Sequence, residues 1–320
     1  MTKRDFLKVT DLSLAEAREV LSLATRLKRE PKNARSRLLA GRSVAIVLEK
    51  ACTRTRVSFE VGCAELGAYP VVLGVQGSQL GRGEPIRDTA RVLARYCDAI
   101  VYRTSATTRL LEMATASVPV VNALTDDGHP VQILCDIFTI EEQVGGIRGK
   151  RVAFVGDCGC NMARSWLEAA PLFDFHLVLA GPAAYGPPAS ELAAAGSHVT
   201  VVHDPKNAVV GCDVVNTDVW TSMGQEAETD ERTDAFAGWT VNEQMLHSAK
   251  PEAIVLHCLP AHRGEEIDTP TLEGPRSRVW DQAENRLHVQ KALLAWLLGA
   301  GGAGVYSRSR RNALCAFAHG

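Results

Sequence analysis

The chain has 320 residues, of which 46% are hydrophobic and 22% are charged, and its formal net charge is -2. This composition is typical of a folded globular protein, and the length suffices for two domains with separate cores. A nearly neutral chain has no overall positive field to hold nucleic acid or an anionic membrane surface, so any anion site must be local. No apolar run approaches the roughly 20 residues that span a bilayer. Nine dispersed cysteines and a polar N-terminal segment predict a reducing, cytoplasmic location.

The first half of the chain predicts alternating helices and strands. Apolar residues at helical spacing from Leu14 to Leu27 predict an amphipathic helix that closes near Pro31. The other helices expected in this half cover residues 56–66, 88–96 and 109–116. The expected strands cover residues 43–48, 71–75, 99–102 and 118–122. Between them, residues 77–87 are rich in glycine and polar side chains and predict an exposed loop.

The same alternation of strands and helices continues after a long apolar helix expected at residues 131–143. Gly145-Gly146 marks the most plausible domain boundary. Beyond it, strands are expected at residues 151–156, 176–180, 199–202, 214–217 and 254–258, and helices at 162–170 and 289–298. Strands that alternate with helices predict the α/β class, with a parallel sheet flanked by helices in each domain. The glycine- and arginine-containing tail, residues 299–320, is interpreted as mobile and solvated rather than as a nucleic-acid arm.

Three polar loops at element boundaries are the candidate functional segments. One, residues 52–56, opens a helix with Cys-Thr-Arg-Thr-Arg; a second, residues 129–132, opens another with His-Pro-Val-Gln; a third, residues 257–264, follows an apolar strand. Free N–H groups and the dipole at a helix start attract anions, and arginine donors favour phosphate over carboxylate. The alternative for the first loop is a threonine cap with solvated arginines. Together the loops predict one convergent anion site.

Other polar segments carry weaker signals. Residues 156–161 follow a strand and precede a helix, but they do not match the dinucleotide fingerprint G-x-G-x-x-G. Cys158 and Cys160 lack a second ligand pair, so packed cysteines are expected rather than a metal site. Asp218 follows a strand and stands beside a Ser-Met-Gly loop. It is either a ligand for a cationic substrate or a helix cap, and residue chemistry alone leaves both open.

Seven motifs in series resemble the ornithine carbamoyltransferases of the aspartate/ornithine carbamoyltransferase family. In chain order they occupy residues 53–60, 78–81, 88–93, 129–132, 218–224, 257–260 and 283–286, and the resemblance covers roughly residues 5–298. Aspartate carbamoyltransferases are similar in the first half only. The Ser-Met-Gly loop and His-Cys-Leu-Pro, both in the second half, therefore favour ornithine.

The resemblance implies carbamoyl transfer from carbamoyl phosphate to the δ-amine of L-ornithine, giving L-citrulline and phosphate in arginine biosynthesis, without metal or cofactor. It implies residues 1–143 as a carbamoyl-phosphate domain, 144–285 as an ornithine domain, and 286–320 as a helix returning to the first domain plus the tail. It also implies a homotrimer in which each chain contributes Gln79 to the active site of the neighbouring chain.

The resemblance assigns catalytic roles to Arg54, Arg103, His129 and Cys258. Carbamoyl phosphate is assigned to Cys52, Thr53, Arg54, Thr55, Gln79, Arg103, His129, Gln132, Cys258, Leu259 and Arg286. Ornithine is assigned to Asn161, Asp218, Ser222 and Met223.

Two positions depart from the family pattern. Cys52 stands where the family usually has serine, and Cys160 replaces a usual asparagine beside Asn161. A thiol is a weaker hydrogen-bond partner than a hydroxyl, so the first change either weakens carbamoyl phosphate binding or marks tolerance to a phosphate-mimicking inhibitor.

Two alternative functions remain open. One is a carbamoyltransferase for a related amine such as putrescine or an N-acylated ornithine. The other is a degenerate family member that binds ligand without catalysis. Asp218 with its Ser-Met-Gly loop argues against the first, because these groups suit a free α-amino acid. Retention of Arg54, Arg103, His129, Asp218 and Cys258 argues against the second.

Overall fold

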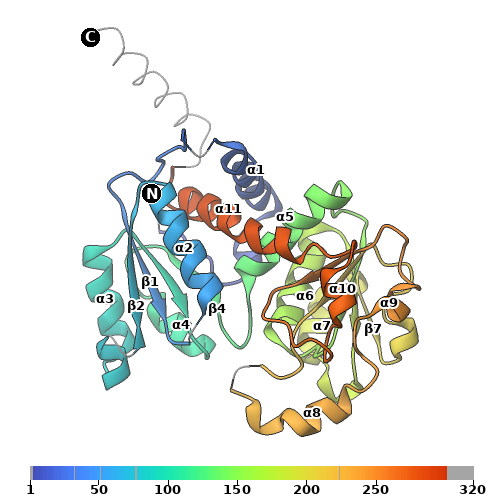
Figure 1. Ribbon diagram of the computed structural model, residues 1–320. Coiled ribbons are helices and arrows are strands. Elements are labelled where there is room, and N and C mark those ends of the chain that lie inside the picture. The colour runs from blue at the N-terminus through green and yellow to red at the C-terminus, as the bar shows by residue number, and fades with distance from the viewer. Residues whose placement is uncertain (1–2, 32, 51, 76–77, 223, 301–320) are drawn as a thin grey trace. The chain divides into compact units, whose positions relative to one another are not determined.

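The structure is a computed structural model that describes the chain except residues 1–2, 32, 51, 76–77, 223 and 301–320 (Figure 1). Met223 and nearly all of the expected tail therefore lie outside the described residues. The chain forms two compact units: one comprises the segment up to Leu7, Ala15–Ala123 and the part from Leu287 onward, and the other comprises Lys8–Leu14 and Leu124–Arg286. Within the described part, no helix has both the length and the apolar character needed to cross a membrane.

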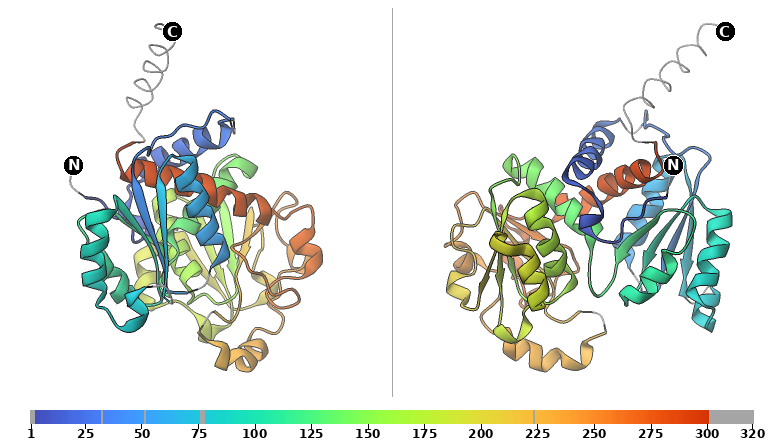
Figure 2. Two further views of the ribbon diagram at one scale, coloured as in Figure 1. Left: turned by 60° about the vertical axis from the view of Figure 1, so that its left-hand side comes forward. Right: turned by 180° about the vertical axis from the view of Figure 1, so that it is seen from behind.

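The first unit is built on a four-stranded sheet with the order β2-β1-β3-β4. The strands are β1 (Ser43–Leu48), β2 (Tyr69–Gly74), β3 (Ala99–Arg103) and β4 (Val120–Leu124). The main helices are α1 (Leu14–Arg29), α2 (Thr53–Glu65), α3 (Ile86–Tyr96) and α4 (Thr107–Met113). β1 pairs in parallel with both β2 and β3. Apolar residues of α3 and α4 pack with Ala45, Val47, Ile100 and Tyr102 on one face, and α2 covers the other (Figures 1 and 2).

The second unit contains a five-stranded parallel sheet with the order β7-β6-β5-β8-β9. The strands are β5 (Arg151–Val155), β6 (His176–Ala180), β7 (Val199–Val202), β8 (Val214–Thr217) and β9 (Ile254–His257). The helices are α5 (Pro130–Val144), α6 (Asn161–Phe173), α7 (Ala189–Ala195), α8 (Thr229–Ala235), α9 (Glu243–Leu246) and α10 (Thr269–Glu273).

Side-chain alternation assigns the two faces of this sheet. Val155, Val215 and Val255 pack with Trp220 and other residues from the segments around α8–α10. Asn216, one residue further along β8, points the other way and accepts a hydrogen bond from Trp166 of α6 (3.3 Å). The central strands are therefore buried on both faces, as expected for a parallel sheet.

The last helix, α11 (Val279–Leu297), begins in the second unit and ends in the first. In the first unit it packs on α2: a Cβ at Gly62 would lie 3.2 Å from the Lys291 side chain. The Lys291 ammonium donates to Glu65 at 2.6 Å, and both side chains are less than 10% exposed. The expected return of the C-terminal helix to the first domain is confirmed.

Several boundaries differ from the sequence-based expectation. α2 begins at Thr53 rather than residue 56, and α11 begins ten residues before the expected 289. The expected loop at 77–87 contains the 3-10 helix Gln79–Arg82, and α7–α10 were not predicted. α8–α10 are short and rich in polar residues, and α7 is mostly alanine, so their apolar periodicity is weak. The two compact units divide at residues 7/8, 14/15, 123/124 and 286/287. The domain bounds expected at 143/144 and 285/286 stay predictions.

Candidate active site

The first predicted anion loop lies at the carboxyl end of β1, where it opens α2. Cys52 is the N-cap of α2: its sulfur accepts a hydrogen bond from the Thr55 N–H (3.4 Å), and its thiol lies 3.0 Å from Thr55 Oγ1. Thr55 is fully buried, whereas Thr53 is exposed. The cap leaves other first-turn N–H groups facing outward, which is the arrangement that favours an anion.

Arg103 joins this loop from the end of the neighbouring strand, β3. It is 5% exposed, and its Nη1 lies 3.5 Å from Thr55 Oγ1. Arg54 is half-buried, and its Nε–H has no hydrogen-bond partner among the described residues. The guanidinium groups of Arg54 and Arg103 thus stand beside one helix N-terminus. Gln79 is exposed on its 3-10 helix.

Glu49 was not predicted, yet it organises the strand ends that carry these groups. Its carboxylate accepts from Tyr102 Oη (2.5 Å), Thr104 Oγ1 (2.6 Å) and Arg109 Nε and Nη2 (3.0 and 2.6 Å). Its backbone N–H donates to the Arg103 carbonyl at 2.9 Å. Burial raises the Glu49 pKa, but these donors outweigh it and hold the pKa below its usual value. Both residues flanking Arg103 are therefore anchored to one carboxylate.

In the second unit, the predicted His-Pro-Val-Gln loop forms the start of α5, with His129 as N-cap. His129 is 3% exposed and its backbone N–H donates to Ser165 Oγ (2.8 Å). Gln132 is 1% exposed, and its Oε1 accepts from Arg286 Nη1 at 2.7 Å. Two residues assigned to carbamoyl phosphate, 154 positions apart in the chain, are thereby in direct contact.

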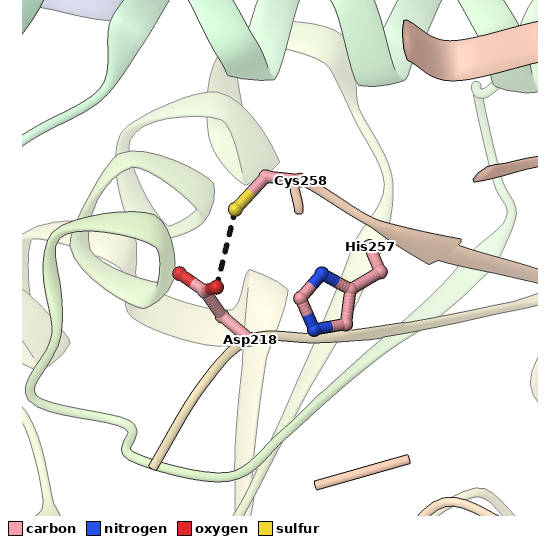
Figure 3. A group of neighbouring side chains, drawn as sticks. All are labelled: Asp218, His257 and Cys258. Carbon is pink, nitrogen blue, oxygen red and sulfur yellow. Dashed lines mark hydrogen bonds between the residues drawn. The ribbon is translucent and has the colours of Figure 1, made fainter. Parts of the chain in front are cut away.

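Asp218 and Cys258 meet at the carboxyl ends of the adjacent strands β8 and β9 (Figure 3). The Cys258 thiol donates to Asp218 Oδ1 at 3.1 Å. Burial and the neighbouring Asp218 charge raise the pKa of Cys258 well above its usual value, so the sulfur is a neutral thiol near pH 7. Burial also raises the pKa of Asp218. A protonated thiol is a hydrogen-bond donor and a poor nucleophile, which agrees with substrate contact rather than covalent chemistry.

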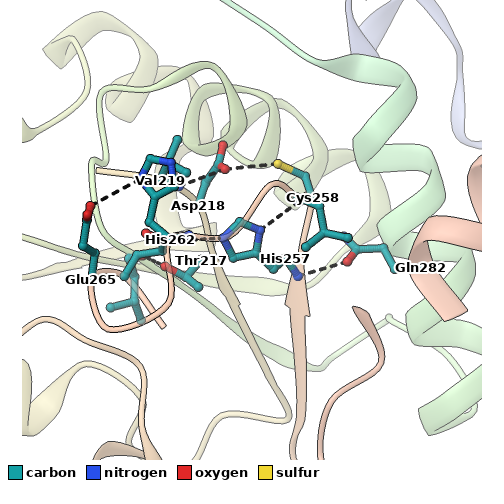
Figure 4. Close-up of polar contacts among 11 residues, drawn as sticks. Thr217, Asp218, Val219, His257, Cys258, His262, Glu265 and Gln282 are labelled. Carbon is teal, nitrogen blue, oxygen red and sulfur yellow. Dashed lines mark hydrogen bonds and ion pairs between the residues drawn. The ribbon is translucent and has the colours of Figure 1, made fainter. Parts of the chain in front are cut away.

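His257 has a structural role that fixes the turn after β9 (Figure 4). Its Nδ1 accepts from the Leu259 N–H (2.8 Å), so the ring proton sits on Nε2, which donates to the buried Glu266 (3.0 Å). Leu259 has φ +58°, a strained conformation for a residue with a branched side chain, and the Leu259–Pro260 peptide bond is cis. The buried imidazole thus sets the backbone beside Cys258.

The residues assigned to ornithine follow two adjacent strand ends, those of β5 and β8. Asn161 is the first residue of α6, and its Nδ2 donates to the Thr125 carbonyl (3.0 Å). The Ser222 N–H donates to the Gln225 side chain (3.1 Å). A Cβ at Gly156 would lie 3.6 Å from the Asp218 carbonyl, so the β5 and β8 loops are in contact. Met223 lies outside the described residues.

Arg232 of α8 holds both ends of the Ser-Met-Gly loop. It is 6% exposed and donates to the Trp220 carbonyl at 2.9 Å and to Glu228 at 2.9 Å. A third bond, to Asp157 at 2.7 Å, ties the loop to the end of β5. The guanidinium also lies over the Tyr185 ring, 5.0 Å from its centroid. The loop is therefore attached at both ends to the framework that carries Asp218.

Asp218, His257 and Cys258 are close enough to form a metal-ligand group. However, both ring nitrogens of His257 and the Cys258 thiol already make the hydrogen bonds described above, and thiol ligation requires the thiolate. Their arrangement fits a protein hydrogen-bond network better than a metal centre. Cys158 and Cys160 are buried, and in the described part of the chain neither belongs to a group of potential ligands.

Comparison with known proteins agrees with this geometry. The profile described as "Aspartate/ornithine carbamoyltransferase, carbamoyl-P binding domain" matches residues 4–142, and the Asp/Orn binding domain profile matches residues 148–297. An ornithine carbamoyltransferase of Sorangium cellulosum (strain So ce56) is 70% identical over 93% of this chain and 99% of that protein. One of Acidothermus cellulolyticus is 55% identical over 94% and 99%. The solved ornithine carbamoyltransferase of Pyrococcus furiosus superposes with TM-score 0.88 at 44% identity, covering 93% of this chain and 98% of that one. The chain therefore belongs to the aspartate/ornithine carbamoyltransferase family.

Proposed function

We propose that this protein transfers the carbamoyl group of carbamoyl phosphate to the δ-amine of L-ornithine, giving L-citrulline and phosphate. The observation that carries the proposal is the Asp218–Cys258 pair at adjacent strand ends, next to the Ser-Met-Gly loop. Curated relatives at 70% and 55% identity that bear the ornithine carbamoyltransferase name support the choice of second substrate. The role in arginine biosynthesis remains a prediction from the resemblance, and the cytoplasmic location remains a prediction from the cysteines and the N-terminal segment.

In this proposal the first unit recognises the phosphate group. The first turn of α2 with Cys52, Thr53, Arg54 and Thr55 supplies N–H and side-chain donors, and Arg103 supplies a buried cation. Phosphate leaves with growing negative charge, so these preorganised donors stabilise the transition state more than the ground state. One such donor typically contributes about 3 kcal/mol to the barrier reduction.

Other residues are assigned to the carbamoyl end and the amino acid. His129 and Arg286 are assigned to carbamoyl phosphate, Gln132 to its carbamoyl end, and Leu259 to the point where the δ-amine meets the carbamoyl carbon. Asn161, Asp218, Ser222 and Met223 are assigned to the α-amino and carboxylate groups of ornithine. The neutral thiol of Cys258, held by Asp218, is assigned to the point where the δ-amine meets the carbonyl carbon. The amine attacks the carbonyl carbon and a tetrahedral intermediate forms. The C–O bond to phosphate then breaks, and the departing phosphate takes the proton that the amine loses, without a covalent enzyme intermediate.

The test is a citrulline assay with three amines. Purified protein with carbamoyl phosphate should turn over L-ornithine at least a hundredfold faster, as kcat/KM, than putrescine or N-acetylornithine, because neither competitor presents a free α-amino acid to Asp218. Faster turnover of another amine would contradict the choice of substrate. Absence of carbamoyl transfer to all three would contradict catalysis itself and favour a binding role.

We further propose a homotrimer in which Gln79 completes the neighbouring site. Gln79 is exposed on its own chain, which agrees with a role toward another chain. Inactive Gln79→Ala chains mixed with inactive Asp218→Ala chains should recover part of the activity after subunit exchange, since some mixed sites combine two intact residues. Exchange without recovery would contradict the shared site.

A further inference from the structure

Asp136 is a charged residue inside an otherwise buried helical segment. It lies in α5, where residues 130–140 are all buried, and it is itself 0% exposed. It forms no ion pair in the described part of the chain, and its carboxylate oxygen Oδ2 has no hydrogen-bond partner there. Burial raises the Asp136 pKa to about 7, although amide donors and Arg286 oppose this. A buried carboxylate without a paired cation is costly, so packing alone gives no reason for its presence.

The other oxygen, Oδ1, receives two glutamine side chains. Gln132 Nε2 donates to it from the preceding turn of α5 at 2.8 Å. Gln282 Nε2 donates to it from α11. One carboxylate oxygen of Asp136 therefore connects Gln132, which is assigned to carbamoyl phosphate, with Gln282 of the last helix, α11.

Each glutamine presents its opposite, carbonyl end to a group that can only donate. Gln132 Oε1 accepts from Arg286 Nη1 (2.7 Å), and Gln282 Oε1 accepts from the His257 backbone N–H (3.0 Å; Figure 4). A guanidinium or a backbone N–H can only donate, so it requires the carbonyl end of each amide. The orientation of both amides is thus determined by chemistry: a reversed amide would place two donors or two acceptors face to face.

We infer that Asp136 is a positioning residue, which fixes the amide of Gln132 for the carbamoyl group and, through Gln282, the strand end that precedes Cys258. This inference rests on the proposed function. Without the acceptor at Oδ1, the Gln132 amide is free to reverse or swing, and Arg286 loses a fixed acceptor. The effect should fall on the carbamoyl end of the substrate, because in the described part of the chain the hydrogen bonds to the Asp136 carboxylate come from Gln132 and Gln282, and none comes from the first turn of α2 or from Asn161, Asp218 or Ser222.

The experiment compares two substitutions of Asp136. Asp136→Leu keeps the size but removes the acceptor, whereas Asp136→Asn keeps an acceptor at Oδ1 and removes the charge. For Asp136→Leu we expect KM for carbamoyl phosphate to rise at least tenfold and kcat to fall at least tenfold. The inhibition constant of inorganic phosphate and KM for ornithine should change less than twofold. Asp136→Asn should stay within fivefold of wild type in all constants.

A matched control is Thr139→Val, one turn further along α5. Thr139 is also fully buried and accepts from Asn285 of α11 (2.9 Å), so its loss removes a comparable buried hydrogen bond between the same helices. It should lower stability without changing any kinetic constant more than twofold. If Asp136→Leu does not fold, Asp136→Ala, which leaves space for a water, replaces it with the same expectation.

Three results would overturn the inference: unchanged KM for carbamoyl phosphate in the Leu or Ala variant, equal changes in the phosphate inhibition constant, or an Asn variant as impaired as the Leu variant. Wild-type citrulline formation in the same assay tests the proposed function separately. A wild type that makes citrulline while the Asp136 variants match it would refute only the positioning role.

Discussion

Replacing Glu49 by glutamine should destabilise the protein substantially, although Glu49 is not assigned to either substrate. The carboxylate receives four hydrogen bonds from Tyr102, Thr104 and Arg109, and its side chain is 11% exposed. Glutamine retains one acceptor oxygen and turns an NH2 group toward donors. A hydrogen bond to a charged group contributes about 1.5–3 kcal/mol, and the Arg109 bonds are discounted because that side chain is 40% exposed. We therefore expect Glu49→Gln to lower the free energy of unfolding by about 2–4 kcal/mol.

Urea unfolding at pH 7, followed by circular dichroism, measures this difference. The matched control is Glu60→Gln in the same unit. Glu60 pairs with Arg56 at 3.4 Å, but both side chains are more than 40% exposed, so the change should be at most about 0.5 kcal/mol. A Glu49→Gln variant as stable as the control would refute the anchoring role of Glu49.

The stability difference between wild type and Glu49→Gln should also depend on pH. The Glu49 pKa in the folded protein lies below its ordinary value of 4.5. A lowered folded pKa contributes stability above the unfolded pKa, and that contribution is lost as the pH falls through the folded pKa. The stability gap between wild type and Glu49→Gln should therefore be constant from pH 6 to 7 and narrow below pH 4.5. A gap that widens on acidification would contradict the assignment.

The remaining predictions concern substrate constants. Arg54→Ala should reduce kcat/KM by several orders of magnitude with little change in the melting temperature, because the residue stabilises charge at a polar loop; near-full turnover would remove it from the phosphate assignment. Cys52→Ser should tighten carbamoyl phosphate binding by roughly 1 kcal/mol in the dissociation constant and raise the melting temperature, since serine is a better N-cap acceptor; weaker binding would mean that the loop is adapted to sulfur. Arg232→Ala should raise KM for ornithine at least tenfold while KM for carbamoyl phosphate stays within twofold; equal changes in both would indicate general destabilisation rather than loss of the loop anchor.

The sequence predicted the sheet strands well because these carry local signals, whereas the roles assigned to the site residues stay predictions. Buried parallel strands are continuous apolar runs, and β1, β6, β7 and β8 match their expected bounds to the residue. Helix starts were less accurate. Cys52 is not a usual cap, so the start of α2 at Thr53 carried no capping signal, and Trp280 to Arg286 is polar enough to hide the first turns of α11.

Residues that act through other residues were missed for a different reason. Glu49, Asp136 and Gln282 acquire their roles from contacts with distant segments: Gln282 and Asp136 are 146 positions apart. One local signal was available. Asp136 is the only acidic residue in the apolar stretch 130–140, and a lone charge on a buried helix face indicates a specific partner. Which residues are the partners of Asp136 could be learned only from the fold.

The return of α11 to α2 also has a consequence for synthesis on the ribosome. Lys291 and Glu65, which pair across these helices, are separated by 226 residues. At a translation rate of about 5–20 residues per second, roughly 10–45 s pass between the synthesis of α2 and that of α11, the helix that covers it. The second unit, contiguous from Leu124 to Arg286 apart from one short N-terminal segment, is complete before that helix is fully translated. A nascent chain therefore exposes the Gly62 surface of α2 throughout this interval, and this surface is where chaperone binding or premature association between growing chains should concentrate.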